Sequence, residues 1–218
     1  DIKGIEVVSE DEGHVHVKAM AGENWHEFVL HCISRNYGGL ENLSLIPGNV
    51  GTTPIQNIGA YGTEIKDTFV SCEAMNIETQ QIKIFTKEEC EFAYRESIFK
   101  GRLRGQYIIT SVTFRLTTSN HKINTSYGDI AAELTRNNIV VPTIKDVSDA
   151  VTAIRRSKLP DTKELGNSGS FFKNPVIPAE DFERAYLQHP QMPHYNVSDT
   201  EVKVPAGWLI EQCGFKGK

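Results

Sequence analysis

The sequence lacks a long hydrophobic run, a closely spaced cysteine pair and a standard nucleotide-binding consensus. No stretch of 18 apolar residues occurs in the 218-residue chain and no basic-then-apolar leader opens it, so we expect neither a membrane span nor secretion. The four cysteines show neither CxxC nor zinc-ligand spacing. We therefore interpret Cys32, Cys72, Cys90 and Cys213 as reduced, mainly buried thiols of a cytoplasmic protein.

An overall excess of basic residues is also missing. The 23 Lys and Arg residues stand against 28 Asp and Glu residues, and a net charge of −5 argues against nucleic acid as a partner. Residues 155–173 are a local exception, because five basic residues there accompany only two acidic ones. A local charge of +3 on an acidic chain suits a small anionic ligand.

Metal sites and hydrolase sites have little support. His14 and His16 project to the same face of a predicted strand, but no third ligand accompanies them, and zinc usually needs three or four. His26 and His31 are more simply residues of a helix surface or an interface. Ser170 lies outside a GxSxG frame and has no histidine near it in the sequence, so a hydrolase nucleophile is not indicated.

Hydrophobic periodicity predicts an α+β fold. Apolar residues at helical spacing predict one helix that begins after Asn24 and ends at Gly38 and Gly39. Two hairpins, a further strand and two further helices are predicted in residues 5–20, 70–86, 107–116, 126–137 and 143–158. In the last helix, the apolar positions Val147, Ala150, Val151 and Ile154 are expected to face inward. Because these elements do not alternate with βαβ regularity, we expect α+β, with a domain boundary near residue 158.

Two capping patterns predict short helices. Thr53 can cap a helix whose first position is Pro54, where a missing N–H costs little, although Gly59 and Gly62 prevent a long one. Thr86 and Glu89 have the spacing of a capping box.

Residues 42–62 contain no charged side chain, although 23% of the chain is charged, and they include four glycines and two prolines. Such a backbone can approach a phosphate closely: Gly48 and Gly51 let N–H groups converge, and a helix start at Thr53 adds further donors. The amides of Gln56 and Asn57 can read the edge of a ring. The alternative is a buried Ω-like connection packed by its own side chains. We favour a ligand, since uncharged loops are seldom only structural.

Three motifs in this order resemble those of the UDP-N-acetylenolpyruvoylglucosamine reductase family. They are IPGNVGTTPIQNIGAYG, YRESIFK and GNSGSFFKNP, and the similarity extends from AGENWHEFV to AGWLIEQCGFKG. Members of this family are FAD enzymes of bacterial peptidoglycan precursor synthesis, which serves cell wall biogenesis, cell shape and cell division. The segment TSYGDI resembles the form with an extra loop that carries a substrate-contacting tyrosine.

The resemblance implies a fold and an extent. Residues 1–157 would be the second half of a vanillyl-alcohol-oxidase-type (PCMH-like) FAD-binding domain, with the tyrosine loop at about 120–136. Residues 158–218 would be a small α+β substrate-binding domain, truncated at its C-terminus. The family's first glycine-rich FAD loop and its catalytic glutamate have no match here. We therefore expect the 218-residue chain by itself to bind FAD weakly or not at all, and not to turn over.

The resemblance also implies site residues. Arg95 would bind the enolpyruvyl carboxylate and Ser170 would donate a proton, although an arginine beside Glu96 is usually a surface ion pair and a serine after Gly169 is usually a turn residue. The FAD contacts would be Ile46, Pro47, Gly48, Asn49, Gly51, Thr52, Thr53, Gln56, Asn57, Ile58, Gly59 and Gly62. The substrate contacts would be Tyr61, Tyr94, Tyr127, Lys158, Asn174 and Gln212.

The implied reaction uses NADPH to reduce the flavin, which then passes hydride to C3 of the enolpyruvyl group of UDP-N-acetylglucosamine enolpyruvate. Arg95 would stabilise the charge that develops and Ser170 would protonate C2. The implied protein is a cytoplasmic monomer without a nucleic acid, membrane or metal partner. Two alternatives remain open: another flavin oxidoreductase of the same FAD-binding class, and a non-catalytic module that binds a UDP-sugar or a flavin.

Overall fold

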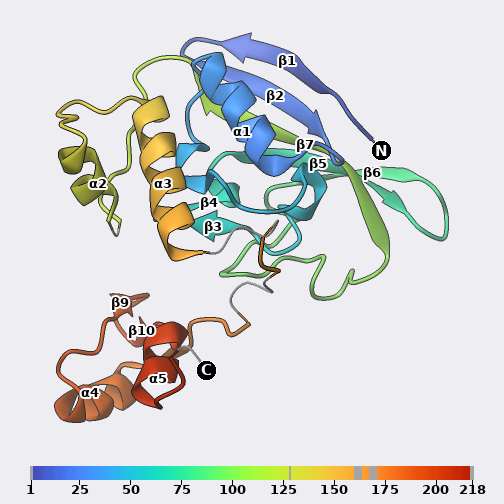
Figure 1. The fold of residues 1–218 in the computed structure, drawn as a ribbon. Coiled ribbons are helices and arrows are strands. Elements are labelled where there is room, and N and C mark those ends of the chain that lie inside the picture. Colours follow the sequence, from blue (N-terminus) through green and yellow to red (C-terminus); the bar gives the residue numbers. More distant parts are fainter. Residues whose placement is uncertain (1, 128, 160–163, 167–170, 217–218) are drawn as a thin grey trace. The chain divides into compact units, whose positions relative to one another are not determined.

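An antiparallel sheet of five strands, in the order β1-β2-β7-β5-β6, is the centre of residues 1–164 (Figure 1). The computed structural model describes residues 2–127, 129–159, 164–166 and 171–216. The chain divides into two units, residues 1–164 and 165–218, and each is described by itself. The strands of the five-stranded sheet are β1 (Ile5–Asp11), β2 (His14–Met20), β5 (Phe69–Asn76), β6 (Ile82–Thr86) and β7 (Tyr107–Thr117).

Buried side chains alternate with less buried ones along the strands, so one face of the sheet lies in the core. Val15, Val17 and Ala19 of β2 are buried, and the residues between them are only half-buried. Val17 lies opposite Phe114 of β7, which is also fully buried. Both predicted hairpins and the predicted strand over 107–116 are confirmed by the β1–β2 pair, the β5–β6 pair and β7.

Helix α1 (Trp25–Ser34) packs its apolar stripe against this face. The Asn24 side chain accepts a hydrogen bond from the Glu27 N–H, so the predicted N-cap is confirmed. The rings of Trp25 and Phe114 lie 5.9 Å apart in the shared core. The predicted end at Gly38 and Gly39 is wrong, because the helix ends at Ser34 and Asn36 already has a left-handed φ of 60°.

The uncharged segment folds without the helix predicted after Thr53. Its elements, continuing to residue 67, are η1 (Glu41–Leu43), η2 (Val50–Thr52), β3 (Gly59–Ala60), β4 (Thr63–Glu64) and η3 (Ile65–Asp67). The buried Thr53 hydroxyl donates to the Val50 carbonyl at 2.7 Å. Thr53 therefore closes the short helix before it, and its hydroxyl points back along the chain rather than toward a helix after it.

The capping box at Thr86 and Glu89 forms without a helix. The Glu89 carboxylate accepts from the Thr86 N–H at 2.9 Å, and the Thr86 hydroxyl accepts from the Glu89 N–H at 3.3 Å. The reciprocal hydrogen bonds are as predicted, but they close a single turn after β6.

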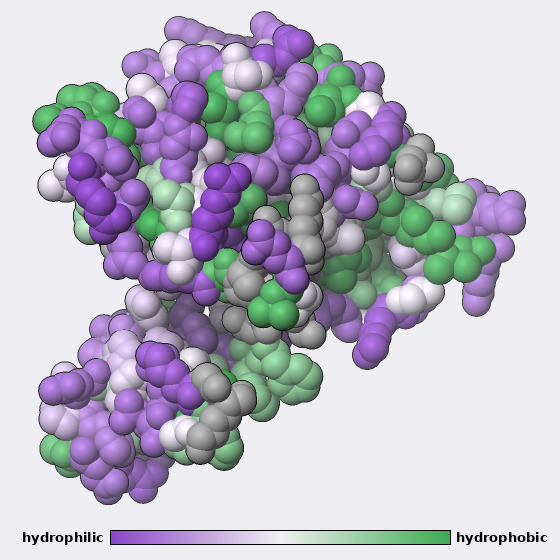
Figure 2. All heavy atoms as spheres, in the orientation of Figure 1, coloured by the Kyte–Doolittle hydropathy of each residue, from purple (hydrophilic) through white to green (hydrophobic). Residues whose placement is uncertain are grey.

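Helices α2 (Ile130–Arg136) and α3 (Ile144–Lys158) form a second core beside the sheet. The inward positions predicted for α3 are confirmed, since Val147, Ala150, Val151 and Ile154 are all buried. The α2–α3 connection is apolar at its tip, where Val140 is 91% exposed and Val141 is 83% exposed. Figure 2 shows these side chains as a hydrophobic patch on an otherwise mainly hydrophilic face of this region.

The unit of residues 165–218 pairs a small sheet with two helices. Its strands are β8 (Val176–Pro178), β9 (Tyr195–Asn196) and β10 (Glu201–Lys203), in the order β8-β10-β9, and its helices are α4 (Ala179–Gln188) and α5 (Ala206–Gln212). Phe182, Met192, Val202 and Val204 form its core. Both units combine antiparallel strands with separate helices, so the predicted α+β class is confirmed.

Within the described residues, no helix is both long and apolar enough to cross a membrane. The same residues contain no group of three or more His, Cys, Asp or Glu side chains arranged to hold a metal ion. His14 instead lies 3.5 Å from an Asp11 carboxylate oxygen, and His16 hydrogen-bonds Ser9.

Candidate functional site

A tight hairpin presents the end of the uncharged segment. In the β3–β4 pair, Gly59 lies opposite Glu64 and Ala60 lies opposite Thr63. The two loop residues, Tyr61 and Gly62, both have positive φ, at 50° and 75°. Positive φ at both central positions is the signature of a type I′ turn, which matches the twist of the strands it joins. The Tyr61 side chain therefore leaves the hairpin at its tip.

Arg95 lies at the tip of a second tight turn. Ala93 and Glu96 form an isolated antiparallel bridge around Tyr94 and Arg95, and Arg95 has a φ of 53°. The guanidinium donates from Nη2 to the Gly59 carbonyl at 2.5 Å, so residues 36 positions apart meet. Tyr94 and Arg95, predicted to contact substrate, therefore lie beside the segment predicted to contact the flavin.

Asn57 joins the two turns. Its buried amide donates to a Glu64 carboxylate oxygen at 2.9 Å and to the Ala93 carbonyl at 3.1 Å. Its carbonyl oxygen accepts from the Lys66 N–H at 3.1 Å. The prediction that the Asn57 amide reads the edge of a ring is therefore wrong, because the buried amide already makes hydrogen bonds within the protein through both its nitrogen and its oxygen. Gln56, its neighbour, is exposed.

The predicted tyrosine loop packs against the hairpin tip. The rings of Tyr61 and Tyr127 lie 6.3 Å apart in an edge-to-face arrangement. The Asn42 amide donates to the carbonyls of both Tyr61 and Asn124, at 3.1 and 2.9 Å. A Cβ at Gly62 would lie 3.1 Å from Asn124 Nδ2, so the glycine permits this close approach.

Lys158, at the end of α3, forms an ion pair with Asp129, the N-cap residue of α2. The hydrogen bond to Asp129 raises the pKa of Lys158, burial opposes the rise, and the Asp129 charge and the Tyr61 phenol add to it. An anionic ligand at Lys158 therefore has to compete with the Asp129 carboxylate. The sequence did not single out Asp129, although it lies within the TSYGDI motif.

The backbone donors of the uncharged segment differ from those predicted. The N–H of Gly51 donates to Ala21 and that of Thr53 donates to Val50. Among the described residues, the N–H groups of Gly48 and Asn49 have no partner, and both residues are exposed. Gly48 has a φ of 119°, a conformation that L side chains rarely adopt. The N–H groups of Gly48 and Asn49 are therefore open to an anion, whereas the Gly51 N–H is not, because Gly51 is bonded to Ala21 and packs against it.

These donors and their surroundings fit the diphosphate of a dinucleotide. Ile46 is half-buried, Pro47 to Asn49 are exposed, and none of them carries a charge that would repel an anion. Thr52 is exposed beside them, and the half-buried Arg155 guanidinium lies at the Leu45 carbonyl, donating from Nε at 3.1 Å. The arrangement combines backbone donors with a nearby cation.

The remaining predicted residues belong elsewhere in the chain. Ser170 lies outside the described residues. In the second unit, the Asn174 side chain accepts from the Ala206 N–H at 3.0 Å and so caps α5. Gln212 is the exposed last residue of α5. The structure therefore brings together Arg95, Tyr61, Tyr127 and Lys158 with the uncharged segment, and it describes Asn174 and Gln212 within their own unit only.

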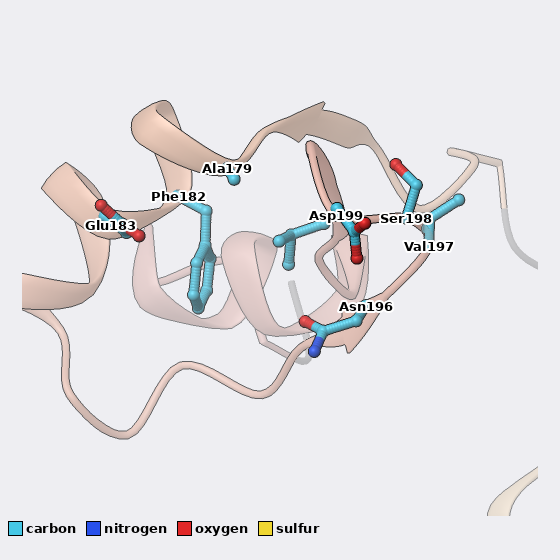
Figure 3. Close-up of a pocket in the computed structure, with 8 residues that line it drawn as sticks. Ala179, Phe182, Glu183, Asn196, Val197, Ser198 and Asp199 are labelled. Atoms are coloured by element: carbon cyan, nitrogen blue, oxygen red, sulfur yellow. The ribbon is translucent and has the colours of Figure 1, made fainter.

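Two cavities contain none of the predicted residues. One, of about 520 Å³, lies between α4 and residues 196–202 (Figure 3). Glu183 and Asp199 line it, so it is unsuited to an anionic nucleotide. The other, of about 330 Å³, lies at an end of the five-stranded sheet, where Lys87, Arg115 and Asp67 contribute side chains.

Known family models match residues in both units. Residues 1–84 match the model of the FAD binding domain, and residues 160–218 match that of the C-terminal domain of UDP-N-acetylenolpyruvoylglucosamine reductase. Over all 218 residues, the chain is 69% identical to the UDP-N-acetylenolpyruvoylglucosamine reductase of Flavobacterium johnsoniae. The chain belongs to this reductase family. The reductases of Neisseria meningitidis serogroup A and Chromobacterium violaceum are 52% and 48% identical over 99% of the chain.

The family relation extends to the fold. The crystal structure of the UDP-N-acetylenolpyruvylglucosamine reductase from Thermus caldophilus aligns with all of this chain and 56% of its own, at a TM-score of 0.57 and 21% identity. At that identity the likeness concerns the fold alone. The chain spans 65% of the Flavobacterium reductase and 62% of the meningococcal one, which is less than two thirds of these family members.

Proposed function

We propose that this chain carries FAD-binding and substrate-binding residues of an NADPH-dependent reductase. Its substrate would be UDP-N-acetylglucosamine enolpyruvate and its product UDP-N-acetylmuramate, a precursor of peptidoglycan, made in the cytoplasm. The observation that carries the proposal is the contact of Arg95 with Gly59, which joins the YRESIFK motif to the uncharged segment. The 69% identity to the UDP-N-acetylenolpyruvoylglucosamine reductase of Flavobacterium johnsoniae supports the same proposal.

FAD would lie along the uncharged segment, with its diphosphate on the N–H groups of Gly48 and Asn49 and its flavin end near the β3–β4 hairpin. When bound, FAD supplies the two-electron chemistry that links NADPH oxidation to reduction of the substrate double bond. The chain contributes position: Asn57 fixes the two turns, and the absence of charge over 42–62 avoids repulsion of the diphosphate.

Arg95 would bind the carboxylate of the enolpyruvyl group. One amino group of its guanidinium is anchored on the Gly59 carbonyl, which orients the fork of remaining N–H donors. As C3 gains hydride, negative charge develops at C2 and spreads into the carboxylate, where a fixed guanidinium stabilises it more than in the ground state.

Lys158 and the two tyrosine rings would hold the nucleotide portion. Lys158 would exchange Asp129 for the substrate diphosphate, and Tyr61 and Tyr127, already packed edge to face, would contact the sugar nucleotide. Asn174 and Gln212 would add contacts from the second unit. Ser170 would give its hydroxyl proton to C2, so that hydride and proton together saturate the double bond. A serine is a weak acid and donates only to a strong base such as this carbanion-like centre.

The test uses a chimera in which this chain replaces the matching segment of the Flavobacterium johnsoniae reductase, 65% of its length. We expect a yellow protein whose flavin is reduced once by NADPH and which, without oxygen, oxidises NADPH continuously only when the enolpyruvyl sugar is present. Ser170→Ala should leave reduction of the flavin by NADPH unchanged and slow its reoxidation by substrate by about 100-fold or more. Ser198→Ala, in the same unit, is the matched control and should change neither.

Two results would contradict the proposal at different points. A folded chimera that binds FAD but never consumes the enolpyruvyl sugar would refute the activity. Normal rates of both half-reactions in Ser170→Ala would refute the role of that serine and leave the activity standing.

A further inference from the structure

Leu45 has a backbone conformation that its side chain disfavours. Its φ is 57°, in the left-handed region that glycine and asparagine usually occupy. It lies directly before Ile46, the first residue of the predicted FAD segment. A strained residue at such a place persists only if its surroundings hold it, so the contacts of Leu45 indicate what the conformation is for.

Two side chains from different helices hold the peptide groups of Leu45. His26, in the first turn of α1, accepts from the Leu45 N–H at Nδ1, at 3.0 Å. Arg155, near the end of α3, donates from Nε to the Leu45 carbonyl at 3.1 Å. A buried hydrogen bond of 2.7 Å between Ser44 and Ser148 ties the preceding residue to α3 as well. The segment between η1 and η2 is thereby attached to both helices, which flank η1 (Figure 1).

The same attachment fixes the donors at Gly48 and Asn49. The Gly48 carbonyl accepts from the Trp25 N–H at 3.0 Å, so α1 holds the chain at Leu45 through His26 and again at Gly48 through Trp25. Only Ile46 and Pro47 lie between these anchors, and the proline ring fixes one further backbone angle. The Asn49 N–H belongs to the same peptide group as the Gly48 carbonyl, so the Trp25 contact fixes its direction. The direction of the Gly48 N–H depends instead on the conformation of the segment between the two anchors, which begins at Leu45.

We propose that His26 and Arg155 are positioning residues for FAD: they hold Leu45 in the left-handed conformation, and this conformation directs the N–H group of Gly48 toward the diphosphate, beside the Asn49 N–H that the Trp25 contact fixes. The proposal rests on the proposed FAD site. His26 acts here as an acceptor, so its Nδ1 must be unprotonated. Burial, with Arg156 and Arg155 nearby, lowers the pKa of His26 against the opposing charge of Glu27, which favours that form.

The first measurement concerns the hydrogen bond alone. Amide hydrogen exchange is followed in the 218-residue chain without FAD. His26→Ala should speed exchange of the Leu45 amide by about tenfold, the effect of losing one hydrogen bond. His26→Asn should restore slow exchange, because the asparagine oxygen can take the place of Nδ1. His31→Ala is the matched control on the same helix and should leave this amide unchanged.

The second measurement concerns the cofactor. In the chimera, His26→Ala should weaken FAD binding by about tenfold and His26→Asn should restore it. Leu45→Gly should reduce the penalty of His26→Ala, since glycine adopts a positive φ without help. Arg155→Gln should also weaken FAD binding, whereas Arg156→Gln, at an exposed neighbour, should not.

The outcomes separate the two proposals. Unchanged FAD affinity in His26→Ala, with faster exchange at Leu45, would mean that the hydrogen bond is only structural and would overturn the positioning role. An equal penalty in the Leu45→Gly background would also overturn it. If the unsubstituted chimera binds no FAD, the proposed function fails, and the exchange experiment still decides whether His26 holds Leu45.

Discussion

Four non-glycine residues of the candidate site have positive φ: Leu45, Asn57, Tyr61 and Arg95. For Leu45, Tyr61 and Arg95 this conformation costs about 1 kcal/mol or more, whereas asparagine adopts it more readily, and such residues concentrate at functional sites. Each of these residues is held by a hydrogen bond that involves a side chain. His26 and Arg155 bond the backbone of Leu45, and the Asn57 amide bonds Glu64. Asn42 bonds the Tyr61 carbonyl, and Arg95 bonds Gly59 through its side chain and Lys100 through its carbonyl. Specific side-chain contacts therefore hold the site in place.

The protonation of His26 should make stability depend on pH. Its pKa is lowered in the native state, chiefly by burial, so the unfolded chain binds a proton more readily than the folded one. The contribution of His26 is therefore complete above its unfolded pKa of about 6.5 and is lost as the pH falls from there toward the native pKa. We expect the free energy of unfolding, measured in urea, to fall between about pH 7 and pH 5.

His26→Asn should flatten this pH dependence, because asparagine does not titrate. His31→Asn is a partial control: the pKa of His31 is also lowered, mainly by burial, but His31 makes no contact with Leu45 among the described residues. An unchanged pH profile in His26→Asn would show that other groups cause the slope.

The β3–β4 hairpin is too short to be stable through its own strands. Two residues on each side pair across the turn, and isolated hairpins of this kind are at best marginal in water. Its position depends on Asn57 below it and on Ser97, whose hydroxyl donates to the Ile55 carbonyl at 2.6 Å. The element that carries Gly59 and Tyr61 is therefore fixed by side chains distant in the sequence.

Asn57→Ala should lower the free energy of unfolding by about 3 kcal/mol, because three hydrogen bonds of about 1 kcal/mol each are lost at a buried position. Gln56→Ala, at the exposed neighbouring position, should change it by less than about 0.5 kcal/mol. Urea titration of both variants checks this. Equal effects of the two substitutions would contradict the anchoring role of Asn57.

At the scale of elements, the predictions from the sequence were most reliable for helices and strands that bury one face over several turns or several cross-strand residue pairs. The buried stripe of α3 lies on the predicted residues, and α1, β2 and β7 form within the predicted ranges. The predictions of the two short helices, after Thr53 and after Thr86, were wrong. Thr53 and Thr86 have the side chains of helix caps, but the Thr53 hydroxyl bonds backward to Val50, and Thr86 closes one turn. A cap lowers the cost of a helix that packing already favours, and neither site offers a buried apolar face to continue it.

At the scale of the whole chain, the main core of residues 1–164 and the core of residues 165–218 differ greatly in size. The sheet and α1 bury Trp25, Phe28 and Phe114 completely or nearly so. Among the described residues of 165–218, the core consists of four buried apolar side chains. A smaller domain buries a smaller fraction of its surface and is correspondingly less stable.

The two tryptophans report on the two units separately, since Trp25 lies in the first and Trp208 in the second. We expect urea to change the fluorescence of Trp208 at a lower concentration than that of Trp25, with a smaller slope because less surface is exposed. Trp208→Phe should remove the early transition and leave the later one in place. A single transition in the unsubstituted chain, coincident with that of Trp208→Phe, would contradict independent unfolding.

The sequence by itself determined the α+β class, the long helices and strands, and the family, since three ordered motifs identify it. These follow from local periodicity and from residue identity, which need no knowledge of distant contacts. The placement of Arg95 on Gly59, the tyrosine pair and the ion pair of Lys158 with Asp129 were decided by the tertiary structure alone.

The tertiary structure also decided which groups can meet a ligand. Asn57 and Gly51 looked like ligand contacts in the sequence, yet the Asn57 amide holds the hairpin and the Gly51 N–H bonds Ala21. His26 looked like a surface residue, yet it holds Leu45 in its left-handed conformation. The physical reason is that a polar group serves whichever partner the fold brings within hydrogen-bond distance, and for residues distant in the sequence that partner is set only when the elements pack.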